Sequence, residues 1–261
     1  MVRYSILIIS AIFLSSRIID EKKLKPTVWL IGDSTVKNGN GKGEGGLWGW
    51  GDYLCQQFDT TKIAIRNYAL GGRSSRTFIT GGLWEAVLAK MKSGDYLIIQ
   101  FGHNDSSTVN DSTRARGTLK GTGNDTEEID NLLTKKHEIV HSFGWYIRKY
   151  ITESKTKGVT PIVCSLIPRN NWENGKVIRS SGDYAKWAEE SAVKEKAFYI
   201  NLNEIISARY DSMGEDAVKT KFFLTDHTHT NEAGAILNAA SVAEGIRSLK
   251  NCNLKKILKV K

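Results

Sequence analysis

The amino-acid sequence predicts an α/β fold built on a parallel, doubly wound sheet of roughly five strands, with helices on both faces. Two observations lead to this prediction. Short, almost uninterrupted apolar segments recur along the chain, as expected for strands buried on both faces of a parallel sheet. Longer segments with the apolar spacing of amphipathic helices lie between them, and this alternation favours strand–helix–strand units. The 261 residues are enough for one large domain with a sizeable core.

Each predicted element rests on its own stretch of sequence. The strands are apolar runs such as TVWLI at 27–31 and DYLIIQF at 95–101, and the helices carry hydrophobic residues three and four positions apart. The predicted strands are 27–31, 62–68, 95–101, 160–167 and 197–202, and the predicted helices are 47–58, 83–91, 137–155, 183–196 and 231–249.

The segment 106–134 interrupts this alternation. It is rich in Ser, Thr, Asn, Asp and Gly and has almost no apolar residues. A polar stretch of this length inside a compact domain is typical of a functional loop or an insertion. We therefore expect one domain over 23–250 with a polar loop insertion near 106–134, followed by a basic, solvated or frayed tail at 251–261.

Residues 1–22 resemble a secretory signal peptide. Arg3 precedes an apolar run at 6–14, and the small residues Ser15 and Ser16 follow it. The run is too short for a permanent membrane anchor, and a buried first strand is the alternative. The pattern leaves the cleavage site open, but it predicts a secreted or periplasmic protein with no stable membrane anchor.

Basic residues outnumber acidic ones in this chain. There are 37 Lys and Arg against 28 Asp and Glu, which gives a formal net charge of +9 at pH 7. Such a surplus is typical of proteins that bind a polyanion, although it also serves solubility alone. Because no recognised nucleic-acid-binding module accompanies it, nucleic acid is not the expected partner. The sequence leaves the oligomeric state open.

Four small polar motifs fall where ligands bind in this class of fold. In an open parallel sheet, ligands bind beyond the carboxyl ends of the strands. Three of the motifs directly follow the first three predicted strands, and the fourth precedes the last helix. They are GDS at 32–34, GGRS at 71–74, GHND at 102–105 and DHTH at 226–229. We expect them to meet at one edge of the sheet.

The residue types in these motifs point to acyl transfer. A serine hydroxyl needs an adjacent base to become a nucleophile, and His229 can serve Ser34 in this way. Asp226, three residues earlier, can accept a hydrogen bond from the other imidazole nitrogen, which is the arrangement of a serine triad. Donors for the developing oxyanion would be the backbone N–H groups of Ser34 and Gly72 and the side-chain amide of Asn104.

The motifs also carry a resemblance to a known family. The set of Gly-Asp-Ser, a glycine in the second block, Gly-x-Asn-Asp and Asp-x-x-His is similar to the SGNH (GDSL) hydrolase superfamily. Within it, five segments resemble rhamnogalacturonan acetylesterases, and the likeness extends over about 27–249. These segments are GDSTV at 32–36, GLWGWGDYL at 46–54, NYALGGRSSRTF at 67–78, FGHND at 101–105 and TDHTHTNEAGA at 225–235.

This resemblance implies a three-layer, flavodoxin-like α/β/α fold for the SGNH hydrolase domain, with no cofactor and no metal. It implies Ser34, Gly72, Asn104 and His229 as signature residues, with Asp226 completing the triad, and removal of acetyl groups from pectic rhamnogalacturonan. The expected partner is then an acetylated acidic polysaccharide or oligosaccharide. The alternatives are another SGNH ester hydrolase, such as a xylan acetylesterase or a lipase-like acyl hydrolase, and a catalytically silent polysaccharide-binding protein.

Four residues near these motifs are candidates for substrate binding. Arg73 and Arg76 follow the oxyanion glycine, and a guanidinium suits a uronate carboxylate; the alternative is an internal salt bridge with Asp33 or Asp105 that braces the loop. Trp48 can stack on a sugar ring or pack in the core. Trp172, in the loop after the fourth strand, is a weaker candidate of the same kind, as is Arg169.

A rival motif, His-Glu-Ile-Val-His at 137–141, matches the zinc-binding His-Glu-x-x-His pattern. On a helix, its two histidines would face the same side, as a zinc site requires. The third histidine of the longer metalloprotease pattern would fall at position 147, which is Ile. An acidic residue such as Glu153 or Glu204 is the alternative third ligand, but we expect His137 and His141 to be packed or rim histidines, and no metal.

Overall fold

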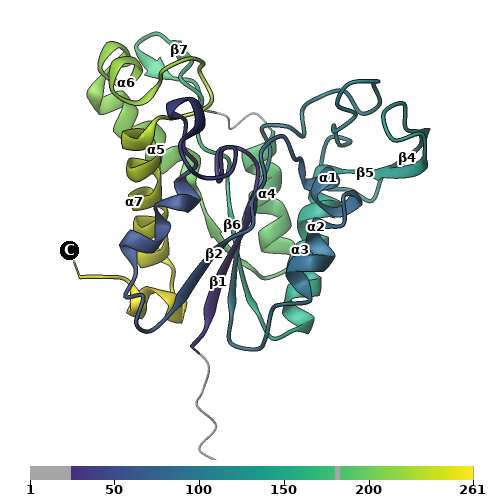
Figure 1. The fold of residues 1–261 in the computed structure, drawn as a ribbon, viewed down its shortest axis with the longest axis horizontal. Coiled ribbons are helices and arrows are strands. Elements are labelled where there is room, and N and C mark those ends of the chain that lie inside the picture. Colours follow the sequence, from purple (N-terminus) through teal and green to yellow (C-terminus); the bar gives the residue numbers. More distant parts are fainter. Residues whose placement is uncertain (1–24, 180–182, 261) are drawn as a thin grey trace, which may run out of the picture.

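The computed structural model describes residues 25–179 and 183–260, so the predicted signal peptide at 1–22 lies outside the described residues. A five-stranded sheet with the order β2-β1-β3-β6-β9 forms the centre of the molecule (Figure 1), and all its strands are parallel. The predicted α/β fold is confirmed. The strands are β1 (Thr27–Gly32), β2 (Ala64–Asn67), β3 (Tyr96–Gln100), β6 (Thr160–Cys164) and β9 (Phe198–Ile200).

Helices cover both faces of this sheet and complete three layers. Successive side chains of β1 point to opposite faces: Val28 and Leu30 pack in one buried cluster, and Trp29 and Ile31 pack in the other. The first face is covered by α5 (Leu202–Met213), α6 (Glu215–Phe222), α7 (Glu232–Ser248) and the 3₁₀ helices η2 (Trp50–Asp52), η3 (Leu54–Gln57) and η4 (Asn253–Ile257). The second is covered by α1 (Ser75–Thr80), α2 (Leu83–Leu88), α3 (Phe143–Thr156) and α4 (Tyr184–Lys194).

Two predicted helices are wrong in part. Residues 47–58 contain η2 and η3 in place of one α-helix, because Gly49 and Gly51 pack directly against the backbone of Val36 and have no room for a side chain. Residues 137–155 contain the strand β5 (His137–His141) followed by α3. Helix α3 begins only after Ser142, whose side chain accepts a hydrogen bond from the N–H of Trp145 and caps the helix.

The polar segment after β3, predicted to be a loop insertion, ends in a hairpin. This hairpin pairs β4 (Thr126–Asp130) with β5 in antiparallel register. It projects from one side of the carboxyl end of the sheet, while α6 and a second, very short hairpin, β7 (Trp172–Glu173) with β8 (Lys176–Val177), lie on the other side (Figure 1). The two projections flank the place where the motifs meet.

The carboxyl-terminal residues are packed, in contrast to the predicted solvated or frayed tail. Leu254 and Leu258 are buried, and the N–H of Lys259 donates to the carbonyl oxygen of Gln57. The apolar residues among the lysines fill a gap between α7 and η3. Within residues 25–179 and 183–260, no helix has both the length and the apolar character needed to cross a membrane.

Candidate active site

Ser34, His229 and Asp226 form a continuous chain of hydrogen bonds beyond the carboxyl end of the sheet. Ser34 Oγ lies 2.8 Å from His229 Nε2, and His229 Nδ1 lies 2.7 Å from Asp226 Oδ2. Ser34 leaves the end of β1, and the other two residues precede α7. The sequence prediction that these three residues lie together therefore agrees with the geometry. Such a chain can activate a serine hydroxyl for attack on a carbonyl carbon.

The carboxylate of Asp226 is held by its own backbone turn. Its Oδ1 accepts hydrogen bonds from the N–H groups of Thr228 and His229, both at 2.7 Å. Burial raises the pKa of Asp226, but the bonds from the His229 ring and from the two N–H groups outweigh burial and hold the pKa at about 2. The carboxylate is therefore charged at neutral pH and can stabilise an imidazolium at His229.

The turn that carries Ser34 is fixed by a buried polar network. Asp33 Oδ1 accepts hydrogen bonds from the N–H and hydroxyl of Thr35 at 2.9 and 2.7 Å. The Thr35 hydroxyl in turn accepts from Gln100 Nε2 at 2.7 Å, and Gln100 Oε1 accepts from Trp50 Nε1 at 2.7 Å. These contacts join the ends of β1 and β3, which pair at Gly32 and Gln100. They hold the Ser34 hydroxyl in place before any substrate arrives.

Three groups are placed to donate to an oxyanion. Among the described residues, neither the N–H of Ser34 nor the N–H of Gly72 has an acceptor. The amide of Asn104 donates one hydrogen bond to the carbonyl oxygen of Arg73 at 2.8 Å and has a second N–H hydrogen to offer. Gly72 has a φ of +76°, a conformation that glycine adopts without strain. The three predicted oxyanion donors thus border the same space, although their role stays a prediction.

Asp105 braces the third turn and is not among the residues that line the hollow beside Ser34. Its carboxylate is fully buried and accepts hydrogen bonds from the N–H and hydroxyl of Ser75 and from the N–H of Gly102. These bonds connect the start of α1 with the end of β3. They fix Asn104 and Gly72 relative to each other.

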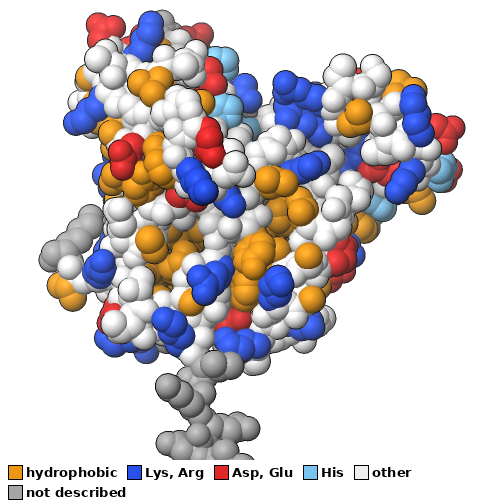
Figure 2. Space-filling model, viewed as in Figure 1, with side chains coloured by type: hydrophobic (Ala, Val, Ile, Leu, Met, Phe, Trp, Pro, Cys, Tyr) orange, Lys and Arg blue, Asp and Glu red, His pale blue; other side chains and the backbone are white. Residues whose placement is uncertain are grey.

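A hollow of about 300 Å³ opens beside the serine and histidine. Figure 2 shows this hollow between the two projections, with Lys and Arg side chains on the wall that carries the β4–β5 hairpin. His103 lies in its wall, almost fully buried, and burial lowers the pKa of His103 to about 4. The lining residues are Ser34, Gly72, His103, Asn104, Arg114, Arg116, Arg169, Thr228 and His229.

The two arginines proposed from sequence do not line this hollow. Arg76 is fully buried, and its Nε and Nη2 atoms donate to the two carboxylate oxygens of Glu138 at 2.6 and 2.7 Å. It is therefore a brace, and its partner is neither Asp33 nor Asp105. Arg73 is exposed and lies outside the lining. The guanidinium groups that do line the hollow belong to Arg169, which was a weaker candidate from sequence, and to Arg114 and Arg116 in the polar segment, which the sequence motifs did not indicate.

The two tryptophans proposed for sugar stacking also lie outside the hollow. Both are partly buried and pack on the core cluster under α7. The indole N–H of Trp172 donates to the side chain of Asn170. Trp48 has a structural role, because its backbone N–H donates to the carbonyl oxygen of Thr230 at 2.9 Å and so anchors the segment that carries His229.

The His-Glu-x-x-His motif lies on a strand, which removes the geometry of a zinc site. Four residues along a strand span about 13 Å, whereas two ligands of one zinc ion lie within about 4 Å of each other. His137 is exposed, and His141 stacks on Trp145 with 3.7 Å between ring centroids. Glu138 is engaged by Arg76. Within residues 25–179 and 183–260, no cluster of His, Cys, Asp and Glu side chains could hold a metal ion.

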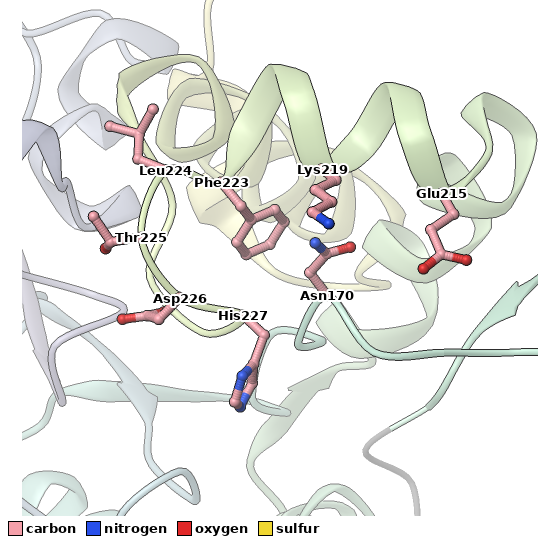
Figure 3. A pocket seen from close by; sticks show the side chains of 8 residues that line it. All are labelled: Asn170, Glu215, Lys219, Phe223, Leu224, Thr225, Asp226 and His227. Atoms are coloured by element: carbon pink, nitrogen blue, oxygen red, sulfur yellow. The ribbon is translucent and has the colours of Figure 1, made fainter.

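A second hollow, also of about 300 Å³, lies on the other side of the Asp226 segment. Figure 3 shows that the Asp226 carboxylate points away from Lys219 and Glu215, which line this hollow from α6. The backbone of His227 lies between the two hollows and accepts a hydrogen bond from the N–H of Asn170 at 2.7 Å. The segment from Asp226 to His229 thus forms a shared wall.

A family model described as GDSL-like lipase/acylhydrolase matches residues 28–242, which includes every residue of the serine–histidine–aspartate chain. The chain belongs to the GDSL-like lipase/acylhydrolase family. The resemblance stated from the sequence motifs is confirmed, and the protein is a hydrolase of ester bonds.

Relatives in this family share most of the length of the chain. Rhamnogalacturonan acetylesterase from Emericella nidulans is 29% identical over 223 residues, 85% of each chain. A Bacillus subtilis protein named probable rhamnogalacturonan acetylesterase YesY is 31% identical over 227 residues, which cover 85% of this chain and 93% of the relative. The crystal structure of Bacillus subtilis YxiM matches with a TM-score of 0.67 and 26% identity, over 85% of this chain but only 56% of YxiM.

Proposed function

We propose that this GDSL family hydrolase is a serine carbohydrate esterase that removes acetyl groups from pectic rhamnogalacturonan. The observation that carries the proposal is the hydrogen-bonded chain of Ser34, His229 and Asp226 beside an arginine-lined hollow. Relatives named as rhamnogalacturonan acetylesterases, at 29–31% identity over most of the chain, support the substrate. The net charge of +9 fits an acidic polysaccharide.

The reaction begins with an attack on the acetyl group. Ser34 Oγ forms a bond to the acetyl carbonyl carbon while His229 Nε2 takes the hydroxyl proton, and Asp226 stabilises the imidazolium. The carbonyl oxygen becomes an oxyanion that accepts hydrogen bonds from the N–H groups of Ser34 and Gly72 and from Asn104. Loss of one such donor typically costs about 3–4 kcal/mol of transition-state stabilisation.

The intermediate then collapses and is hydrolysed. The bond between the carbonyl carbon and the sugar oxygen breaks, and the sugar oxygen takes the proton from His229, which leaves an acetyl ester on Ser34. Water then attacks this ester while His229 accepts a proton from the water. Acetate leaves, and the proton returns to Ser34 Oγ.

Ser34→Ala tests the assignment of the nucleophile. We expect acetate release from acetylated rhamnogalacturonan to fall at least 10³-fold, since single removals of triad members have effects of this order or larger. The melting temperature should stay within a few degrees of the wild type, because Ser34 is only half-buried. Substantial activity in a folded Ser34→Ala variant would mean that another group attacks the ester.

A substrate panel separates the proposed substrate from its rivals. Acetylated rhamnogalacturonan, acetylated xylan and nitrophenyl esters of short and long acids are compared by kcat/KM. We expect preference for the pectic polymer and for short acyl chains; preference for xylan or for long chains would overturn the substrate and leave the chemistry intact.

We also propose that the protein is secreted or periplasmic, on the basis of the charged and apolar pattern at 1–22. Amino-terminal sequencing of the protein made by its host tests this: a mature chain that begins within about 15–30 residues supports export, and an intact amino terminus in the cytoplasm contradicts it.

A further inference from the structure

We propose that Arg114 and Arg116, together with Arg169, bind the carboxylate of a uronate residue next to the acetylated sugar. The inference rests on the proposed function and adds to it a specificity determinant, namely a pair of arginines supplied by the polar insertion. It replaces Arg73 and Arg76 in the role that the sequence suggested for them.

The three arginines beside Ser34 have no negatively charged partner in the described residues. All three guanidinium groups line the hollow beside Ser34, and within the described residues none of them has a carboxylate oxygen within 4 Å. Arg76, Arg148 and Arg209 have carboxylate partners in Glu138, Glu195 and Glu244, whereas the three arginines of the hollow have none in the described part of the chain although they lie around one space. Three unpaired cations around one hollow repel each other and attract an anion.

The turn that carries Arg114 and Arg116 is held in a strained shape. Asp111 accepts four hydrogen bonds, from the N–H and hydroxyl of Thr113 and from the N–H groups of Arg114 and Ala115, at 2.6–3.1 Å. Ala115 is buried and has a φ of +38°, which is unfavourable for a residue with a Cβ. Strain of this kind persists only where surrounding contacts enforce it, and it is concentrated at functional sites.

Arg114 and Arg116 both have N–H groups that make no hydrogen bond within the described residues. Arg116 donates from Nε to Ser107 Oγ at 3.2 Å and from Nη1 to the carbonyl oxygen of Gly72 at 3.1 Å. Three of its five N–H groups are left over. The Arg114 side chain donates to no group in the described part of the chain and is exposed. A planar guanidinium matches a carboxylate through two parallel hydrogen bonds, so these donors suit a uronate better than a neutral sugar.

Arg114→Gln is the decisive variant, because its side chain supports no contact of the fold. We would measure kcat and KM of the full-length enzyme on acetylated rhamnogalacturonan, acetylated xylan and 4-nitrophenyl acetate. The expected result is a roughly tenfold or larger rise in KM on the pectic polymer, the size expected for a lost charged hydrogen bond. The two uncharged substrates should change less than twofold. Arg66→Gln, which removes an exposed arginine from strand β2, is the matched control and should change none of the three.

The outcomes separate this inference from the proposed function. If wild-type enzyme releases acetate from the pectic polymer and Arg114→Gln does so with unchanged KM, uronate binding by this pair is wrong and the esterase proposal stands. An equal loss on all three substrates would also overturn the inference, since it would mean general damage to the site. If wild-type enzyme hydrolyses 4-nitrophenyl acetate but not the pectic polymer, the proposed substrate itself fails, and the uronate site with it.

Discussion

Glu138→Gln is expected to destabilise the whole domain, because it leaves a buried guanidinium without its counter-charge. Arg76 is fully buried and the Glu138 side chain is 14% exposed. Nη1 of Arg76 also donates to the carbonyl oxygens of Val109 and Gly117 at 2.8 Å, so the guanidinium cannot leave without breaking the insertion. Removing one partner of such a pair typically costs about 3–5 kcal/mol of folding free energy.

This loss of folding free energy lowers the melting temperature by a measurable amount. In domains of this size, 1 kcal/mol corresponds to about 2–4 °C. Glutamine keeps the size of the side chain and one acceptor oxygen, so we expect a loss of folding free energy at the lower end of this range. Such a loss corresponds to a fall in melting temperature of about 6–12 °C at pH 7, measured by circular dichroism. The exposed pair of Arg209 and Glu244 gives the control: Glu244→Gln removes less than about 1 kcal/mol.

The difference in melting temperature between wild type and Glu138→Gln should depend on pH, which provides a second check. Burial raises the pKa of Glu138, but the bonds from Arg76 and Asn131 outweigh burial and leave the pKa below its ordinary value of 4.5. A lowered carboxyl pKa stabilises the fold above pH 4.5, and this contribution disappears as pH falls through the pKa of the folded state. The melting temperatures of wild type and Glu138→Gln should therefore converge in acid. A fall of less than 2 °C at pH 7, or an equal fall in Glu244→Gln, would refute the reasoning.

Three further outcomes are expected. Asp226→Asn should lower kcat by about 10²–10⁴-fold with little change in KM, because an amide favours the wrong tautomer of His229. Steady-state kinetics on acetylated rhamnogalacturonan measure this effect, and an undiminished kcat would remove Asp226 from the triad. Melting temperature should decline as pH falls from about 6.5 to 4, since burial lowers the pKa of His103 to about 4 and protonation then favours the unfolded chain. In His103→Gln the melting temperature should decline less over this pH range, and a decline as steep as in the wild type would contradict the role given to His103. Dialysis against EDTA should leave esterase activity unchanged; a loss restored by zinc would contradict the reading of His137 and His141 as ordinary strand residues.

The architecture and the placement of the candidate catalytic residues could be predicted from sequence because both depend on local patterns. Apolar runs mark buried strands, and the segments that follow them must emerge at the same edge of a parallel sheet. The spacing of Asp226 and His229 is short enough for one turn to bring their side chains together, and the structure has them 2.7 Å apart.

The surroundings of these groups could not be predicted, because they depend on contacts between distant segments. Glu138, the partner of Arg76, is 62 residues away along the chain, and nothing near either residue indicates the pairing. Arg114 and Arg116 reach the hollow only through the path of an irregular loop, which has no periodicity to interpret. The strand at 137–141 could have been recognised from Ser142, a residue type that commonly precedes the first turn of a helix.

The segment from Asp226 to Thr230 is held to neighbouring parts of the chain through hydrogen bonds to its backbone. The carbonyl oxygens of His227 and Thr230 accept from Asn170 and Trp48, and these bonds form whatever side chains the two acceptor residues carry. The exposed side chains of Leu224 and His227 can therefore change in evolution without moving the base. Point mutations at these two positions should therefore reshape the second hollow, which both residues line, without disturbing the hydrogen-bonded chain of Ser34, His229 and Asp226.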